Sequence, residues 1–564
     1  MVLIESLIHL LATAHTKHMP KAQTGKGFQI DITDFSGGVN TLDNPRELQQ
    51  NQAQVAHNFD IVGRGSLQKR YGYDVVSSGG ANSIQGLRRF KKTDSPTGTF
   101  LIIFDGNQEV FKITPSNSTF TSIGSHTGTA GERVNSIVFN NLCIFNSADA
   151  NSSVHKTDGS TETQLGGSPP NTSVFATNDR VLFLAGDPDN PSIFYWCDLD
   201  NPENWSSGVA SNQDVAVGDG TVIKAITVHN DNFTIFKEKA KYGAFPVLDG
   251  TTDQPTGFVT KEVFDRSDGT QATNSVAYAY TGVYYLGSPE KGFQRYGIEG
   301  NFPDRRIPQN ISYVISPDVK KIRRSAIDKS ASLYFDNRYY CAVPFQSDIN
   351  TMTFVYNDIF AAWTTWNIPA SCFEVFEDAD GKEEIYFGLE ADNKLCKFNT
   401  KFYDQFDNDT AEGFPIIAIW RSKVYRPSSH NAFKSVLVRG AITDTEETEV
   451  EFKSIVRTKG NDGEKQIGRV KIHKETITKN DILLESEEVP TADVGDFYVG
   501  NQFLGSQEAE QDLKEFEKII HVPVELNRGE EIEFELVSRK AGEGIRIDLI
   551  SLFGETMTDQ DLIY

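Results

Sequence analysis

The sequence is poor in the residues that build disulfide frameworks and metal centres. Its 564 residues include only five cysteines and no Cys-x-x-Cys pair. This odd, widely spaced set indicates neither a zinc site nor a disulfide framework, and it predicts reduced thiols that lie mostly in strands. No run of 18 apolar residues occurs, so no membrane-spanning segment is predicted. The cysteines are Cys143, Cys197, Cys341, Cys372 and Cys396.

Basic residues are also scarce. Lys and Arg number 54 against 78 Asp and Glu, a formal net charge of −24, which disfavours general adhesion to nucleic acid or anionic membranes. An acidic protein can still handle DNA where the DNA must slide rather than bind. The 38 Phe, 19 Tyr and 5 Trp exclude bulk disorder, and 45 Gly and 21 Pro are typical of turn-rich, all-β folds.

Signatures of catalysis are absent as well. The sequence has no P-loop, no Gly-x-Gly-x-x-Gly, no His-Glu-x-x-His and no Gly-x-Ser-x-Gly motif. The turn from Asp378 to Asp380 resembles the start of a calcium loop, but it lacks the third ligand and the closing Glu. A hairpin turn is the simpler interpretation, and ion binding there stays open. We therefore predict no enzymatic activity, no catalytic residues, no cofactor and no metal.

Residues 1–24 form a leader that stands apart from the rest. Leu3, Leu7 and Leu11 recur at helical spacing, but Glu5 interrupts the apolar stretch, so a secretion signal is not predicted. The leader is either a docking helix or a segment upstream of a true start at Met19.

Residues 25–84 are expected to form an N-terminal strand–helix–hairpin clasp. A strand and a glycine turn precede a predicted helix at about 45–57, which a capping residue and a proline would start. A second glycine turn leads into a strand at 67–71. The residues that carry this structural motif are Gly37, Gly38, Asn44, Pro45 and Gly65.

Residues 85–403 contain a loose repeat that predicts an irregular β-propeller. Aromatic strands recur around short Asn, Asp and Gly turns, which supply the positive φ of tight hairpins. The spacing of about 35 to 55 residues accommodates a four-stranded blade, and a series of stacked β-sandwiches is the structural alternative. The turns lie at 104–107, 139–145, 178–183, 230–236, 280–285 and 335–340.

Residues 413–564 alternate between apolar and polar positions, which predicts an acidic C-terminal β-sandwich-like domain. One short helix is expected near 508–519. Residues 441–564 contain 14 basic and 29 acidic residues, and much of this acidity is expected on solvated strand faces rather than in a metal or cation site.

Two basic islands interrupt the acidity. They lie in strands and turns without a recognised nucleic-acid-binding module, so we interpret them as an interface with an acidic neighbour rather than as phosphate contacts. The possible interface residues are Arg64, Lys69, Arg70, Arg88, Arg89, Arg305 and Arg306, and the islands also include Lys91, Lys92, Lys320, Lys321, Arg323 and Arg324.

Several short motifs resemble the tail nozzle proteins of short-tailed bacteriophages, also called tail tubular or tail hub proteins. The resemblance spans most of residues 28–564. It rests on Phe35–Asn40, Asn51-Gln52, Asn58, Gly65–Tyr73, Pro191–Asp198, Asn201–Trp205, Asp336–Tyr340, Tyr356–Asp358, Trp363 and Ile419–Lys423.

The resemblance implies a non-enzymatic virion protein. It implies a ring of six propeller subunits around a DNA channel, attached to the tail adaptor and used in genome ejection. An acidic channel wall would repel the phosphate backbone and avoid strong binding to the moving genome. The alternative from another class is a carbohydrate-active propeller, either a glycosidase or a tail-fibre-type adhesin.

The clasp is expected to lock the propeller and to order the surface that faces the adaptor. Under this docking hypothesis, Arg70→Glu leaves the chain folded but blocks its incorporation into tails. The structural alternative is that the clasp only completes a sheet.

Overall fold

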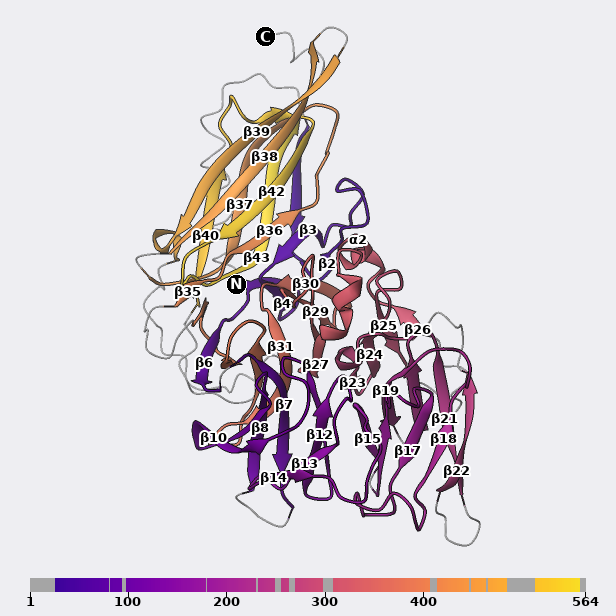
Figure 1. Cartoon of the computed structure of the whole chain (residues 1–564). Helices are drawn as coiled ribbons and strands as arrows, with labels where there is room; N and C mark the ends of the chain where they lie inside the picture. The colour runs from indigo at the N-terminus through magenta and orange to yellow at the C-terminus, as the bar shows by residue number, and fades with distance from the viewer. Residues whose placement is uncertain are drawn as a thin grey trace, which may run out of the picture.

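Figure 1 shows the computed structural model of the chain. The structure describes residues 26–80, 82–93, 98–178, 180–229, 232–248, 255–262, 269–297, 308–405, 413–445, 448–462, 465–483 and 513–557. The leader at 1–24 and the basic pair Arg305 and Arg306 lie outside these ranges. Within them the regular structure is almost entirely β, as predicted. The short helices are η2 (Thr273–Ser275), η4 (Tyr313–Ile315), α2 (Ser316–Val319), η5 (Arg324–Lys329) and η6 (Lys479–Asp481).

The lower part of the molecule in Figure 1 is a β-propeller, which confirms the predicted fold class. Six separate four-stranded antiparallel sheets form blades. The first three consist of β7 (Ile84–Lys91), β8 (Thr99–Asp105), β9 (Glu109–Thr114) and β10 (Asn117–Ser125); β11 (Val134–Phe139), β12 (Leu142–Ser147), β13 (His155–Thr157) and β14 (Glu162–Gln164); and β15 (Val174–Asn178), β16 (Val181–Ala185), β17 (Ile193–Trp196) and β18 (Ser211–Asp214). The others consist of β19 (Ile223–His229), β20 (Asn232–Lys237), β21 (Lys241–Leu248) and β22 (Pro255–Glu262); β23 (Ala277–Ala279), β24 (Gly282–Leu286), β25 (Phe293–Tyr296) and β26 (Pro308–Asn310); and β31 (Ala370–Glu377), β32 (Glu383–Leu389), β33 (Lys394–Phe398) and β6 (Tyr73–Ser78).

A further group of four strands completes the circle between β23 and β31. Its innermost strand β27 contacts both of those strands, and β31 contacts β7. The last blade takes its outer strand, β6, from the N-terminal segment, so residues that precede the propeller fasten it closed. The completing strands are β27 (Ala331–Phe335), β28 (Arg338–Val343), β29 (Met352–Asn357) and β30 (Ala362–Trp366).

The upper part is a β-sandwich, also as predicted. Its seven-stranded sheet contains β4 (Phe59–Val62), β5 (Ser66–Lys69), β43 (Ile545–Thr556), β37 (Asn431–Thr443) and β40 (Leu513–His521), with β1 (Gly27–Ile32) on β43 and β41 (Arg528–Gly529) on β37. The opposite sheet contains β3 (Gln52–His57), β36 (Ala418–Ser422), β42 (Glu531–Ser538), β38 (Glu449–Asp462) and β39 (Lys465–Thr478), with β2 (Gly38–Val39) on β3. Because β3 also pairs with β30, one ten-stranded sheet runs from the propeller into the sandwich. A two-stranded ribbon, β34 (Tyr403–Asp404) and β35 (Phe414–Pro415), lies on the connection between the two parts.

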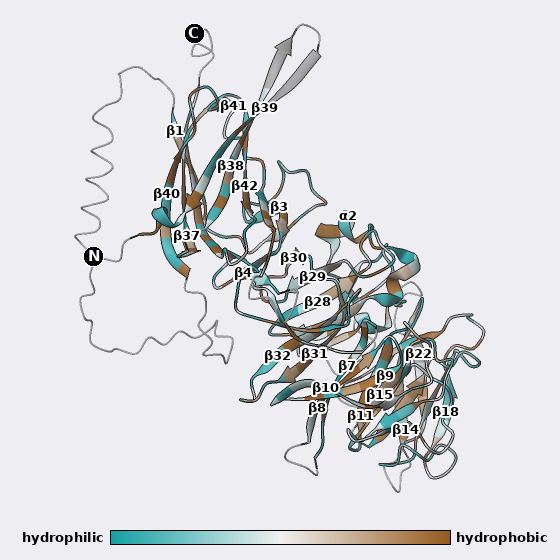
Figure 2. Ribbon diagram, turned by 60° about the vertical axis from the view of Figure 1, so that its left-hand side comes forward, coloured by the Kyte–Doolittle hydropathy of each residue, from teal (hydrophilic) through white to brown (hydrophobic). Residues whose placement is uncertain are grey.

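A single hydrophobic cluster crosses from one part to the other. It includes Phe293 and Trp363 of the propeller together with Val436 and Phe534 of the two sandwich sheets. Figure 2 shows hydrophobic and hydrophilic positions interleaved along the strands of both parts, as expected for sheets with one buried face. The shared sheet and the shared core join the two parts into one body.

The N-terminal clasp does not form a sheet of its own among the described residues. Its strands are divided between the seven-stranded sheet, the ten-stranded sheet and the last blade. The helix predicted at 45–57 is wrong: the backbone N–H of Glu47 donates to the carbonyl of Asn44 in a turn, and the strand β3 follows. Asn44 also accepts the N–H of Arg46 at 3.1 Å. The Asn-Pro signal that starts helices also starts turns, and pairing on both sides of β3 overrides the helical pattern.

The helix predicted near 508–519 is wrong for the residues that the structure describes. Residues from Leu513 onward form strand β40, which pairs antiparallel with β37 from Thr443 to Ser435. Residues 508–512 lie outside the described ranges.

The predicted repeat turns correspond to real hairpins. Five of the six turns join the first two strands of successive four-stranded units, from β11–β12 to β27–β28, and the remaining turn joins β8 to β9. Asn140, Asn141, Asp336 and Asn337 have φ between 46° and 60°. The Asn and Asp residues therefore supply the positive φ for which they were identified.

Candidate functional site

Arg70 is buried at the junction between the propeller and the sandwich. It is 1% exposed, and its guanidinium donates to Asp404 at 2.7 and 2.8 Å, to Asn58 at 2.9 Å, to Asn367 at 2.8 Å and to the carbonyl of Tyr71 at 3.0 Å. The prediction that Arg70 meets a partner is wrong, because a side chain with this burial and these bonds is inaccessible. Arg70→Glu would bring a carboxylate against Asp404, so it would not leave the fold intact.

Lys69 is buried beside Arg70, and its prediction as an interface residue is wrong for the same reason. It is 0% exposed, and its Nζ donates to Ser538 Oγ at 2.8 Å and to the carbonyl of Lys540 at 3.2 Å. Burial lowers the pKa of the Lys69 amine to about 8, although the nearby Glu543 carboxylate opposes the shift. Lys69 thus ties β5 to β42 of the opposite sandwich sheet.

The other residues of the first island lie at the surface or in the propeller. Arg64 is exposed in the β4–β5 turn. Arg89 is paired within the chain, with Glu377 and with Glu383, the latter at 2.5 Å. Arg88 points into the central cavity of the propeller, which is described below.

The described residues of the second island are exposed around α2 and η5. Lys321 pairs with Asp318 at 2.6 Å, and Arg324 pairs with Glu290 at 3.0 Å. Arg323 likewise pairs with an acidic side chain, 2.8 Å away. This surface stays a predicted interface. Arg305 and Arg306, which were predicted to belong to it, lie outside the described residues.

The glycine motif lies at the junction. Gly37 ends the turn before β2, and Gly38, the first residue of β2, has φ of +59°. A Cβ atom at Gly38 would lie 2.7 Å from the Trp363 carbonyl oxygen, so the sandwich segment and the propeller strand β30 approach too closely for any other residue. Gly65 has φ of +102°, and a Cβ there would lie 2.5 Å from Asp34 Oδ1.

Several motifs that resemble the tail nozzle proteins lie at this junction, whereas Pro191–Asp198 and Asn201–Trp205 lie in the third blade, in and after β17. Phe35 packs edge-on against Trp420 with the ring centroids 5.5 Å apart. The Asn58 amide donates to the Ile417 carbonyl at 2.8 Å, and its Oδ1 accepts from Arg70. Residues far apart in the sequence therefore build one connection between the two parts.

Acidic residues of β42 are paired rather than solvated, which corrects the expectation of solvated strand faces there. Glu531, Glu533 and Glu535 are 4%, 2% and 7% exposed. Each forms an ion pair: Glu531 with Arg46 at 2.7 Å, Glu533 with Arg457 at 2.6 Å and Glu535 with Lys453 at 2.7 Å. The three carboxylates alternate with apolar core residues along β42, so they occupy its other face.

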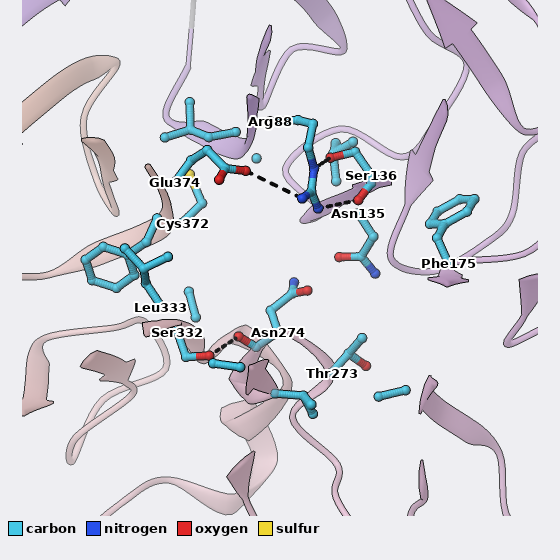
Figure 3. Close-up of a pocket in the computed structure, with 18 of the residues that line it drawn as sticks. Arg88, Asn135, Ser136, Phe175, Thr273, Asn274, Ser332, Leu333, Cys372 and Glu374 are labelled. Carbon is cyan, nitrogen blue, oxygen red and sulfur yellow. Dashed lines mark hydrogen bonds and ion pairs between the residues drawn. The ribbon is translucent and has the colours of Figure 1, made fainter. Parts of the chain in front are cut away.

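The propeller encloses a central cavity of about 340 Å³, shown in Figure 3. All seven innermost strands contribute to its walls, including Leu87, Asn135, Phe175, Thr227, Tyr278, Leu333 and Glu374. Arg88 donates to the Ser136 hydroxyl at 3.1 Å and to the Ser136 carbonyl, and it lies 3.6 Å from Glu374. Burial raises the pKa of the Glu374 carboxyl, while the Arg88 charge opposes this shift.

The cavity does not contain a pair of carboxylates among its described lining residues, where Glu374 is the one acidic side chain. Glycoside hydrolysis by the common mechanisms requires two. No group of His, Cys, Asp or Glu residues suited to a metal occurs in the described ranges. The turn at Asp378 is a hairpin in which this carboxylate accepts the N–H groups of Asp380 and Lys382, both at 2.9 Å.

Sequence reasoning did not find the cavity or the partners of Arg70. The lining residues come from strands scattered over almost 300 positions, and Asp404 stands at the start of a segment that reads as an acidic spacer. No local pattern indicates either arrangement. The five cysteines are free, as predicted. In the part of the chain that the structure describes, no helix has the length and apolar character to cross a membrane.

Comparisons with known proteins give no family. No protein-family model and no curated protein matches the chain. Solved structures with a similar fold include Raptor from Chaetomium thermophilum, with a TM-score of 0.38 and 10% identity over 58% of this chain. They also include BamB from Moraxella catarrhalis, with a TM-score of 0.33 and 10% identity, covering 69% of this chain and 100% of BamB. The chain spans 29% of the Raptor length. These likenesses are too distant to assign a function.

Proposed function

We propose that this chain is a structural virion protein that forms the nozzle, or hub, ring of a short phage tail. Six copies would surround a channel through which the genome is ejected, and the ring would attach to the tail adaptor. The chain would have no enzymatic role and no cofactor, and it would reside in the tail of the virion after synthesis in the host cytoplasm.

The observation that carries this proposal is the junction. Arg70, the polar group with the most hydrogen bonds among those described, joins the propeller to the sandwich. Asn58, a residue of the resemblance, accepts a hydrogen bond from Arg70 at 2.9 Å. A subunit of a ring under load from a moving genome needs a fixed angle between its parts, and a shared sheet and core supply one.

The size of the central cavity bears on the path of DNA. A volume of about 340 Å³ is that of a small-molecule site, so duplex DNA does not fit through a single propeller. The channel of the proposed ring would therefore lie between copies. The net charge of −24 favours passage over binding on such a wall.

The test is a reconstruction of the native assembly. Antibodies raised against the full chain would be used to isolate the particles that contain it, and class averages would be computed. We expect a closed ring of several copies in a tail. Isolation of the chain only as a monomer, outside any particle, would overturn the proposal.

The carbohydrate-active alternative predicts a different result. A glycosidase would release sugar from a bacterial surface glycan as a single soluble chain, and replacement of one carboxylate would abolish turnover. The single carboxylate in the described lining of the cavity argues against this mechanism. Binding without turnover is a separate question.

A further inference from the structure

The central cavity contains a buried acceptor that the described residues leave unpaired. Asn135 is 9% exposed, and its amide nitrogen donates to the Ser173 carbonyl at 2.7 Å. Its side-chain Oδ1 accepts no hydrogen bond from any residue that the structure describes. Buried polar atoms are generally hydrogen-bonded, to protein, water or ligand, so this oxygen marks a place for an external donor.

The Arg88–Glu374 pair faces the same space. Its atoms are 3.6 Å apart, whereas a direct N–H···O bond is about 2.7–3.2 Å long. The other donors of Arg88 are directed at Ser136, and Glu374 Oε1 accepts the N–H of Val375 at 3.1 Å. One guanidinium nitrogen and one carboxyl oxygen thus face each other without a direct hydrogen bond, and the carboxylate also accepts the backbone N–H of Arg89.

Figure 3 shows Arg88, Glu374, Asn135 and Asn274 around one open centre. A hydroxyl oxygen does not fit between atoms 3.6 Å apart, but one beside the pair could contact both, accepting from Arg88 and donating to Glu374. A second hydroxyl could donate to Asn135 Oδ1. Neither a simple anion nor a simple cation matches this set, because the charges of Arg88 and Glu374 oppose each other.

We propose that the central cavity of the propeller binds a neutral sugar of monosaccharide size, with hydroxyls on Arg88, Glu374 and Asn135. The apolar walls at Phe175 and Leu333 face the carbon skeleton of the sugar. The site gives the chain a glycan-binding property beyond its proposed role in tail assembly. It can be tested separately, because sugar binding is measured on the isolated chain and assembly on particles.

The experiment uses the full chain and four probes: D-glucose, D-galactose, N-acetyl-D-glucosamine and L-rhamnose. Binding is measured by saturation-transfer NMR and calorimetry. We expect at least one sugar to bind with a Kd of about 1 mM or tighter. Asn135→Leu and Glu374→Gln should each weaken that binding by about tenfold or more, the loss expected for one buried hydrogen bond.

Glu132→Gln is the matched control, because it makes the same change at an exposed position outside the cavity, and it should bind like the wild type. If Asn135→Leu does not fold, Glu374→Gln decides, since it preserves the shape of the side chain. Absence of binding by all four sugars contradicts the proposal. So does binding that survives Glu374→Gln, or a preference for acetate over every sugar.

Discussion

Two arginine–carboxylate pairs differ in their surroundings: one is buried at the junction between the propeller and the sandwich, and the other faces the central cavity. Arg70 and Asp404 form a bidentate pair at the junction, with side chains 0% and 12% exposed. Arg88 and Glu374 face the central cavity, with side chains 36% and 17% exposed and 3.6 Å between them. The same two chemical groups are in direct contact and buried at the junction, but farther apart and partly exposed at the cavity.

The difference shows how burial decides what an ion pair does. At the junction, neighbouring amides and carbonyls take up the remaining donors of Arg70, so the group acts as a rigid fastener. In the cavity, Asn135 Oδ1 has no described partner and the ion pair is loose, so the groups are available to a ligand. Removing one partner of the first pair would leave an uncompensated buried charge, whereas the second pair is partly exposed and its loss would cost little.

The largest expected effect comes from opening the junction pair. Asp404→Asn removes the charge opposite Arg70 without changing the shape of the side chain, and it leaves a buried cation uncompensated. We expect the free energy of unfolding to fall by about 3–5 kcal/mol. Urea unfolding followed by tryptophan fluorescence would measure it. A loss below about 1 kcal/mol would mean that the pair behaves like a surface pair.

The close approach at Gly38 gives a smaller effect with an internal control. Gly38→Ala and Gly63→Ala both place a Cβ at a positive φ, +59° and +57°. Nothing lies within 4 Å of a Cβ at Gly63, whereas one at Gly38 would meet the Trp363 carbonyl. Gly63→Ala should cost roughly 1–2 kcal/mol of unfolding free energy. Gly38→Ala should cost roughly 1–3 kcal/mol more than Gly63→Ala. If both variants lose the same unfolding free energy, the contact between a Cβ at Gly38 and the Trp363 carbonyl carries no steric cost.

The pH dependence sharpens the comparison at the junction. Burial, with the Arg70 charge, lowers the pKa of His57 to about 4, against about 6.5 in an unfolded chain. Because the folded state disfavours the protonated form, the stabilising contribution is present above pH 6.5 and is lost as the pH falls toward 4. His57→Gln should flatten the fall of the unfolding free energy over this range. His521→Gln, the same change at an exposed position on β40, is the control variant.

The smallest effect is expected at the cavity pair. Glu374→Gln is the counterpart of Asp404→Asn, and it leaves Arg88 bonded to Ser136 and partly exposed. We expect a change of less than about 1 kcal/mol in the same urea experiment. If Glu374→Gln lowers the unfolding free energy as much as Asp404→Asn does, the cavity pair stabilises the fold as much as the junction pair, which contradicts the comparison.

Local patterns predicted the local structure, and tertiary contacts decided the rest. The Asn and Asp turns, such as Asp336-Asn337, predicted the hairpins because a tight turn needs positive φ at two adjacent residues, and Asn and Asp adopt it readily. The segment at 45–57 has helix signals, yet strands from both parts pair with it. Arg70 was visible as a charge, but its partner Asp404 lies 334 residues away. The residues that line the cavity come from seven different strands, so they could be identified only once the closed ring of blades was known.

We expect the junction to make the propeller and the sandwich unfold as a single cooperative body. Hydrogen exchange across a urea series, resolved by peptide mass spectrometry, tests this claim directly. Peptides of the propeller strand β16 and of the sandwich strand β37 should lose protection at the same urea concentration. In Asp404→Asn both midpoints should move down together. Separate midpoints in the wild type, with only one of them shifted by Asp404→Asn, would contradict the account.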